Sequence, residues 1–248
     1  YHGRSLEVAK EVSDKCGEEQ AYGNLGIAYE NLSDFHKAIE YHERHLQIAK
    51  EEGDKAGERL AYGNLGNAYQ CLSHFHKAIE YYECNLQIAK AVGDKAEEGQ
   101  AYGNLGIASA SLSDFHKAIE YHERHLQIAK EEGDKAGEGK AYRNLGNACH
   151  GLGEFHKAIE YHEHHLQIAK EAGDKAGEGE AYGNHGNAYH SLGDLYKAIE
   201  HHKRRLQIAK EVRDKTGEGK AYGNLGNAYD RLGDFHKAIE YHKSHLEI

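Results

Sequence analysis

The chain repeats a forty-residue unit six times, and this period constrains its fold more than any other feature. The segment Ala-Tyr-Gly-Asn-Leu-Gly begins at Ala21, Ala61, Ala101 and Ala221, and it returns with one change at Ala141 and Ala181. A fixed period of this size indicates a solenoid, in which each unit buries its apolar face only against its neighbours. An elongated surface of this kind favours binding over catalysis.

Residues 54–93 illustrate one unit. Apolar residues and a glycine recur at helical spacing in its first half, at Tyr62, Leu65, Gly66 and Tyr69. This stripe predicts an amphipathic helix that ends near Leu72, and a second helix follows from about Phe75 to Ala91. The short link between them predicts antiparallel neighbours. Because Gly66 lacks a side chain, we expect the paired helix to approach closely there, with Ala78 as the facing residue.

Glycine and acidic residues mark the expected helix ends. Asp54 follows Gly53, which suits a helix C-terminus followed by an N-cap. Glycine in the link, at Gly153, Gly193 and Gly233, predicts a left-handed C-cap, and the acidic residue after it can cap the second helix. The chain contains no proline, so its helix ends depend on these caps.

Charge and composition exclude several classes of function. The formal net charge of −10 argues against binding to nucleic acid or to an anionic membrane surface. No stretch approaches the length of a transmembrane helix, and no signal-peptide pattern opens the chain. The four cysteines occupy four different places in the repeat, which favours reduced thiols in a cytoplasmic protein over a zinc or disulfide framework: Cys16, Cys71, Cys84 and Cys149.

The pattern Tyr-x-x-Leu-Gly-x-x-Tyr, followed by Gly-Asp-Phe and Ala-Ile-Glu-Tyr, resembles the tetratricopeptide repeat. The forty-residue spacing and the Gly-Asp-Lys-Ala-Gly-Glu-Gly link resemble a subclass that includes G-protein-signalling modulators of the LGN/Pins type, rapsyn and the large tetratricopeptide repeat protein 28. The resemblance implies an all-α fold, a right-handed superhelical solenoid of antiparallel helix pairs. Gα binding is not carried over from the resemblance, because no GoLoco segment is present in this sequence.

The period sets the expected boundaries. Residues 1–17 are the end of a preceding repeat, and the tetratricopeptide repeats are 18–53, 54–93, 94–133, 134–173, 174–213 and a truncated 214–248. Because the chain opens and stops inside a repeat, we expect it to be a segment of a longer protein.

Two ladders of asparagine lie on the helix side opposite the apolar stripe. The first is Asn24, Asn64, Asn104, Asn144, Asn184 and Asn224, and the second, one turn on, is Asn67, Asn147, Asn187 and Asn227. An amide side chain is both a donor and an acceptor, so such a row can hydrogen-bond the backbone of an extended peptide. In the resembling family, asparagines at these positions line the concave groove. The alternative is that the amides only solvate or cap helices, and the first ladder is the more open to that interpretation.

Residues that vary between repeats must supply specificity. Lys140, Arg143 and Lys220 give the C-terminal half some positive potential, which Glu180 and Asp230 oppose. We therefore consider a protein or peptide partner that carries an acidic stretch.

The chain holds 21 histidines, and four repeats place two of them at i, i+3, as at His42 and His45. That spacing can serve a metal, but other repeats carry Tyr82 and Asn85, or His202 and Arg205, at the same positions. We therefore interpret the histidines as amphipathic filler at a repeat interface. A milder alternative is lower stability below about pH 6, if these imidazoles are buried neutral.

Carboxylates sit where helix pairing uses them, as with Lys37 and Glu40 or Glu40 and Arg44. The sequence has no nucleophile elbow, P-loop or dinucleotide fingerprint. We expect no catalytic residue, no metal site, no cofactor and no small-molecule substrate.

The sequence predicts a protein-binding scaffold or adaptor that holds an extended peptide, with G-protein or cell-cortex signalling implied by the resemblance. The first alternative is a regulatory repeat arm of a larger signalling enzyme or ATPase. The second is a metal- or pH-responsive module built on the histidines.

Overall fold

The structure is a computed structural model that describes residues 2–248, and within that range the chain forms thirteen α-helices and no strand. It divides into two compact units, Tyr1–Ile128 and Ala129–Ile248. The first unit contains α1 (His2–Glu11), α2 (Lys15–Asn31), α3 (Phe35–Glu52), α4 (Lys55–Cys71), α5 (Phe75–Val92) and α6 (Lys95–Ser111). The second contains α8 (Lys135–Gly151), α9 (Phe155–Glu171), α10 (Lys175–Leu192), α11 (Leu195–Val212), α12 (Lys215–Leu232) and α13 (Phe235–Leu246), and the boundary falls within α7 (Phe115–Glu132).

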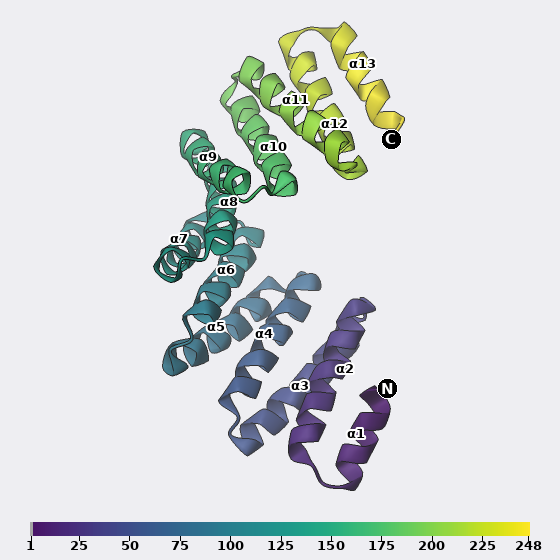
Figure 1. The fold of residues 1–248 in the computed structure, drawn as a ribbon, viewed down its shortest axis with the longest axis vertical. Helices are drawn as coiled ribbons and strands as arrows, with labels where there is room; N and C mark the ends of the chain where they lie inside the picture. Colours follow the sequence, from purple (N-terminus) through teal and green to yellow (C-terminus); the bar gives the residue numbers. More distant parts are fainter. Residues whose placement is uncertain (1) are drawn as a thin grey trace. The chain divides into compact units, whose positions relative to one another are not determined.

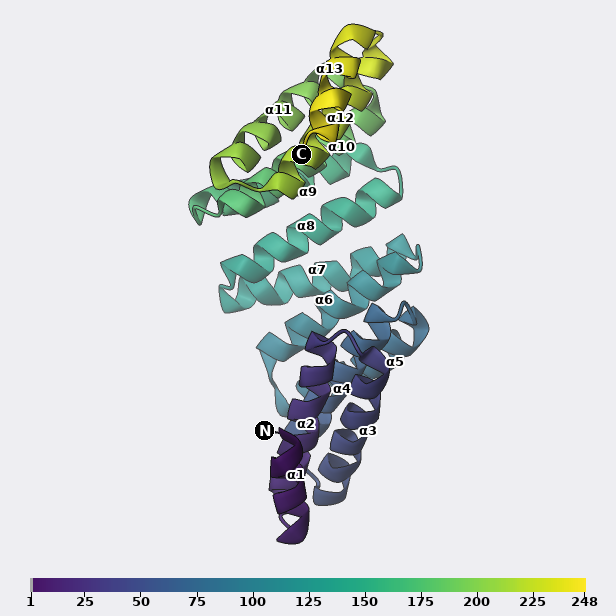
Figure 2. The same ribbon diagram turned by 90° about the vertical axis from the view of Figure 1, so that its right-hand side faces the viewer.

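Helices that follow one another in the chain pack against one another within each unit. The order runs from α1 to α6 in the first unit and from α8 to α13 in the second, as Figure 1 shows by colour. Figure 2 shows the same succession from the side. This all-helical arrangement of consecutive helix pairs confirms the predicted fold class.

Local capping explains where the helices begin and end. Asp54 accepts hydrogen bonds from the backbone N–H groups of Ala56 and Gly57, at 2.9 and 3.0 Å, so α4 begins with a satisfied first turn. Gly53 ends α3 with a φ of 72°, the left-handed conformation that glycine adopts without strain. The link glycines Gly153, Gly193 and Gly233 have φ angles of 80°, 92° and 83°, which confirms the predicted C-caps.

The predicted apolar stripe forms the core. The leucine of the stripe is completely buried in four repeats, at Leu65, Leu105, Leu145 and Leu225. Small alanines pack around it, for example Ala61 and Ala68 on α4, with no exposed surface. Tyrosine rings close the cluster, and Tyr69 stacks on Tyr81 of α5 with ring centroids 5.3 Å apart. Helix pairs are thus held by side chains that recur in most repeats.

The close approach at Gly66 has a different cause from the one predicted. The facing residue is Tyr82 of α5, whose buried ring lies flat against the α4 backbone, and not Ala78. A Cβ atom at Gly66 would stand 2.6 Å from Tyr82 Cδ1, far inside van der Waals contact. Long side chains on a helix lean towards its N-terminus, so a residue one turn further along can cover the place that spacing alone assigns to Ala78.

A histidine ring takes the place of Tyr82 in other repeats. His42 lies against Gly26, and His162 and His202 lie against Gly146 and Gly186 in the same way. These rings are at most 1% exposed. They therefore fill the space between the two helices of one repeat, and His162 also contacts His185 of the next repeat.

Candidate binding groove

A hollow lined mainly by polar residues lies in the second unit between α10 and α12 and has a volume of about 680 Å³. The two first helices of adjacent repeats supply its amides, Asn184 and Asn187 from α10 and Asn224 and Asn227 from α12. Its remaining walls are Glu180, Lys220, Gly223, Arg205 of α11 and His245 of α13. Five of the thirteen predicted site residues, the four asparagines and Lys220, thus surround one space.

Exposure distinguishes the two asparagine ladders. The second ladder, represented here by Asn187 and Asn227, is exposed at every position. The first ladder is half-buried from Asn64 to Asn224, and only Asn24 is exposed. The second ladder is therefore more accessible to a partner than the first ladder, whose side chains are partly covered by the surrounding residues.

One hydrogen bond links amides of the groove, and one buried amide donor lacks an acceptor. The Asn224 Nδ2 group donates to Asn187 Oδ1 at 3.0 Å, which links the two ladders across adjacent repeats. The Asn184 Nδ2 atom is buried and has no hydrogen-bond partner among residues 2–248. A buried donor without a partner costs free energy, so Asn184 is a less favourable position than Asn224, whose amide has an acceptor.

Arg205 is one of four lining residues that the predicted site set omitted, with Glu180, Gly223 and His245. Its side chain lies on the bare backbone of Gly183, and burial lowers the pKa of the guanidinium while the nearby Asp214 and Glu180 carboxylates oppose that shift. The signal was present in the sequence, because five other repeats place His45, Asn85, His125, His165 or His245 at this position. A comparison by repeat position, instead of by helix face, would have selected it.

The three predicted basic residues have different surroundings. Arg143 Nη1 forms an ion pair with Glu180 Oε2 at 3.3 Å, and its Nε donates to Asn144 Oδ1 at 3.4 Å. Lys140 is exposed and Lys220 lines the groove. Glu180 therefore opposes the basic residues, as expected, and does so by direct contact with Arg143.

Two of the predicted residues of the first unit bond side chains of their own repeat. Asn67 Oδ1 accepts a hydrogen bond from the Tyr82 hydroxyl at 2.8 Å, and Asn104 Oδ1 accepts one from Gln100 at 3.0 Å. These amides contribute to packing and to local helix contacts. The alternative of a partly structural role therefore has direct support at Asn67, on the second ladder.

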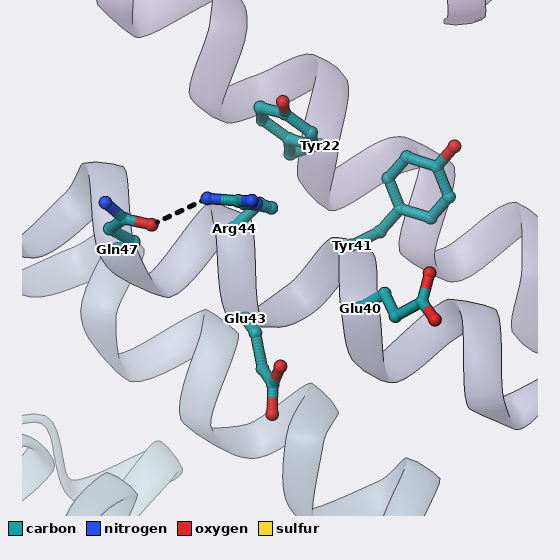
Figure 3. A pocket seen from close by; sticks show the side chains of 6 residues that line it. All are labelled: Tyr22, Glu40, Tyr41, Glu43, Arg44 and Gln47. Carbon is teal, nitrogen blue, oxygen red and sulfur yellow. Dashed lines mark hydrogen bonds between the residues drawn. The ribbon is translucent and has the colours of Figure 1, made fainter.

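A second hollow of about 480 Å³ lies in the first unit beside Tyr22 and Tyr41, whose ring centroids are 6.1 Å apart. Figure 3 shows Arg44 donating to Gln47 within it, at 3.1 Å. Glu40 and Glu43 extend from the same helix, α3. The hollow contains no asparagine of either ladder, so it is not the candidate groove.

The carboxylates pair differently from the prediction at α3. Lys37 Nζ binds Asp34 Oδ2 at 3.3 Å instead of Glu40, and Arg44 bonds Gln47 instead of Glu40. The cap residue Asp34 is nearer to the ammonium group because the first turn brings it alongside, and it also accepts from the Lys37 backbone N–H. Asp34 and Glu40 are both three residues from Lys37, so the spacing in the sequence allowed either carboxylate as its partner.

Residues 2–248 contain no group of three or more metal-ligating side chains placed to hold a metal ion. The four cysteines are free, with Cys149 buried and Cys16 and Cys71 exposed. No described helix has the length and apolar character needed to cross a membrane.

A tetratricopeptide repeat family model matches residues 17–91, 58–131, 97–171 and 177–248, and these matches together cover most of the chain. The chain belongs to the tetratricopeptide repeat family. No curated protein sequence matches it.

Solved structures share the tetratricopeptide repeat architecture at low sequence identity. A signal transduction ATPase with numerous domains and a tetratricopeptide repeat sensor, from Pyrococcus horikoshii, has a TM-score of 0.84 at 20% identity, covering 99% of this chain and 39% of that one. BtubC from P. vanneervenii has a TM-score of 0.76 at 23% identity, covering 86% and 90%. A Rap protein in complex with competence and sporulation factor has a TM-score of 0.70 at 15% identity, covering 93% and 74%. These likenesses concern the fold.

Proposed function

We propose that this protein is a binding scaffold or adaptor whose α10–α12 groove holds an extended peptide segment of a protein partner. The observation that carries the proposal is the gathering of four ladder asparagines around one open hollow. Exposed amides at repeat spacing can hydrogen-bond a peptide backbone whatever its side chains are. The resemblance to G-protein-signalling modulators adds G-protein or cell-cortex signalling in the cytoplasm as the expected setting.

Asparagine substitution tests the proposal. Peptides selected on the chain from a library of random short peptides serve as the probe, and calorimetry measures their affinity. We expect Asn187→Ala combined with Asn227→Ala, which removes two exposed amides that line the groove, to weaken binding by about 1–3 kcal/mol, the scale of two lost hydrogen bonds. Helicity should stay unchanged, because both side chains are exposed.

The matched control removes two amides elsewhere. Gln167→Ala combined with Gln207→Ala deletes exposed side chains that bond only Glu171 and Glu211 on their own helices, so affinity should not change. An asparagine variant that binds as tightly as the control, or a chain that selects no peptide, contradicts the proposal.

The likeness to the Pyrococcus horikoshii ATPase with a tetratricopeptide repeat sensor favours one alternative, a regulatory repeat arm of a larger signalling enzyme or ATPase. In that case, removing the repeats from a longer protein should change the activity of the remaining part. The groove can serve both functions, with the peptide supplied by a partner or by the rest of the same protein.

A further inference from the structure

The solvent-exposed side of α11 differs from that of the other second helices. Four exposed residues lie there at helical spacing and form what we call the α11 patch: Tyr196, Glu200, Lys203 and Arg204. Arg205, which lines the groove, follows Tyr196 by nine residues, so at about 100° per residue it lies on the opposite side of the helix. The α11 patch is therefore a surface separate from the groove.

An exposed aromatic ring begins the α11 patch. Tyr196 is 75% exposed, and every other tyrosine among residues 2–248 is buried or half-buried. The other five repeats carry an exposed histidine at this position, His36, His76, His116, His156 and His236. Packing within the repeat thus does not require the ring of Tyr196. Tyrosine and arginine are the residue types that, with tryptophan, most often dominate the binding energy of protein interfaces.

The charge at the centre of the α11 patch is reversed relative to the earlier repeats. Where α11 has Lys203, the first four repeats have an exposed glutamate, at Glu43, Glu83, Glu123 and Glu163. The sixth repeat also has a lysine, Lys243, but no arginine follows it. Two cations and one carboxylate give the α11 patch a formal charge of +1, whereas the same positions of α3 give −1. The fifth repeat therefore combines an exposed tyrosine with a local excess of positive charge.

The protein does not neutralise the two cations of the α11 patch. Among residues 2–248, no carboxylate lies within ion-pair distance of Lys203 or Arg204, whereas Lys197 on the same helix pairs with Asp194 at 3.5 Å. Lys203 Nζ lies 5.8 Å from the centre of the Tyr229 ring, a contact that leaves its charge uncompensated. Both cations are exposed, so both are accessible to the carboxylates of a partner.

We propose that the α11 patch is a second interaction surface, which docks an acidic segment of a protein partner on the side of α11 away from the groove. Lys203 attracts carboxylates as a point charge, Arg204 can donate two parallel hydrogen bonds to one carboxylate, and Tyr196 adds a large contact area beside them. Because the whole chain carries −10, an acidic segment is repelled from most of the surface, and the local positive charge determines where it docks. This surface acts whether or not the groove binds a peptide.

Loss of binding is tested first. Random short peptides are selected on a chain that carries Asn187→Ala with Asn227→Ala, so that the groove contributes least. We expect peptides rich in aspartate and glutamate, which bind the wild-type chain equally well and more weakly as salt is added. Tyr196→His with Lys203→Glu gives α11 the residues of the first four repeats, so the variant should fold, which melting curves verify. It should bind these peptides about 10- to 100-fold more weakly.

Transfer of the α11 patch to another helix tests whether its residues are sufficient. In α3, Glu40 and Arg44 already occupy the positions of Glu200 and Arg204. His36→Tyr with Glu43→Lys therefore copies the patch onto the first unit. Added to the chain that carries Tyr196→His with Lys203→Glu, these two substitutions should restore the lost affinity.

Three results would overturn the surface: a selection that enriches no acidic peptide, equal binding by Tyr196→His with Lys203→Glu, or a transfer that restores no affinity. Tighter binding to phosphatidylserine vesicles or to single-stranded DNA, lost in the same variant, would overturn the acidic protein partner and assign a phosphate-bearing one. The groove is tested separately, because its own peptides should respond to the asparagine substitutions and not to those in the α11 patch.

Discussion

A glycine in the middle of each first helix is the residue on which the helix pair depends. Glycine costs about 1 kcal/mol relative to alanine in a helix interior, so its presence in all six repeats needs a reason. The reason is the ring that lies on it, Tyr82 on Gly66 and His42 on Gly26. A tyrosine or a histidine fills the same space, so what the position requires is a flat ring.

Two glycines of the first helices, one beneath a buried ring and one with more space around it, should respond in opposite ways to substitution by alanine. Gly66→Ala should destabilise the chain by about 1–3 kcal/mol, because the new methyl group would overlap the buried ring of Tyr82, which has no room to move. Gly219→Ala should be neutral or stabilising by up to about 1 kcal/mol, because its nearest neighbour, His245 Cδ2, would be 3.5 Å away. Urea unfolding measures both. Equal effects at the two positions would contradict the account of the ring.

At the scale of the helix, the sequence period predicted the helix bounds, the buried residues and the caps, because these depend on backbone geometry. It did not predict contacts that depend on the conformations of long side chains. The bounds of α4 and α5, the buried leucine and the glycine caps follow from spacing and elementary helix geometry. The contact of Tyr82 with Gly66 and the ion pair of Lys37 with Asp34 depend on rotamers. The exposure of the second ladder was predictable from helix angles. The position of Arg205 in the groove wall was not, because it depends on which residues of other helices surround it.

The α10–α11 pair differs from the others by two substitutions that meet. His185 replaces the stripe leucine, and His201 replaces the tyrosine of the second helix. Their rings stack with centroids 4.9 Å apart, and His185 also approaches the edge of His162 at 6.1 Å. Three imidazoles thus share one poorly hydrated region of the second unit. We therefore expect the stability of this region to depend on pH.

Acid should destabilise this helix pair. Burial lowers the pKa of His162 to about 3 and of His201 to about 4, below the usual value of about 6.5. Below pH 6.5 the unfolded chain therefore binds protons that the folded chain does not, so the free energy of unfolding falls as the pH drops from about 6.5 towards 4. Urea unfolding at several pH values measures this fall.

The control for the pH effect restores the residues of the other repeats. In His185→Leu combined with His201→Tyr, two of the buried imidazoles are gone, while all carboxylates remain. The variant should lose less stability than the wild-type chain over the same pH range. An identical loss in both proteins would assign the acid sensitivity to carboxylates instead.

At the scale of the whole molecule, the repeat architecture makes stability a sum of local terms. Each helix packs mainly on its neighbours in the chain, so the intrinsic stability of each repeat and its interfaces roughly add. One poor repeat then becomes the place where the array opens, without weakening distant repeats. The right-handed superhelix stays a prediction, because it concerns how the two units continue one another.

The repeat that should open first is residues 178–213. The His185 Nδ1 atom contacts the Ala181 carbonyl oxygen at 3.2 Å, and its buried Nε2 lies 3.4 Å from Glu163 Oε2 without a well-formed hydrogen bond. Arg213 ends α11 in the left-handed conformation, with a φ of 59°, where other repeats use glycine. Both features are less favourable than their counterparts elsewhere.

We therefore expect His185→Leu to stabilise the chain by about 1–2 kcal/mol, the scale of burying one leucine side chain. Hydrogen exchange, away from the chain ends, should be fastest in residues 178–213 and slower in residues 58–93, where Leu65 fills the same place with no exposed surface. The variant should slow exchange in residues 178–213 and leave residues 58–93 unchanged, because the two lie in different units. Equal protection of the two segments, or a lower melting temperature for His185→Leu, would mean that the imidazole makes favourable contacts that a leucine cannot replace.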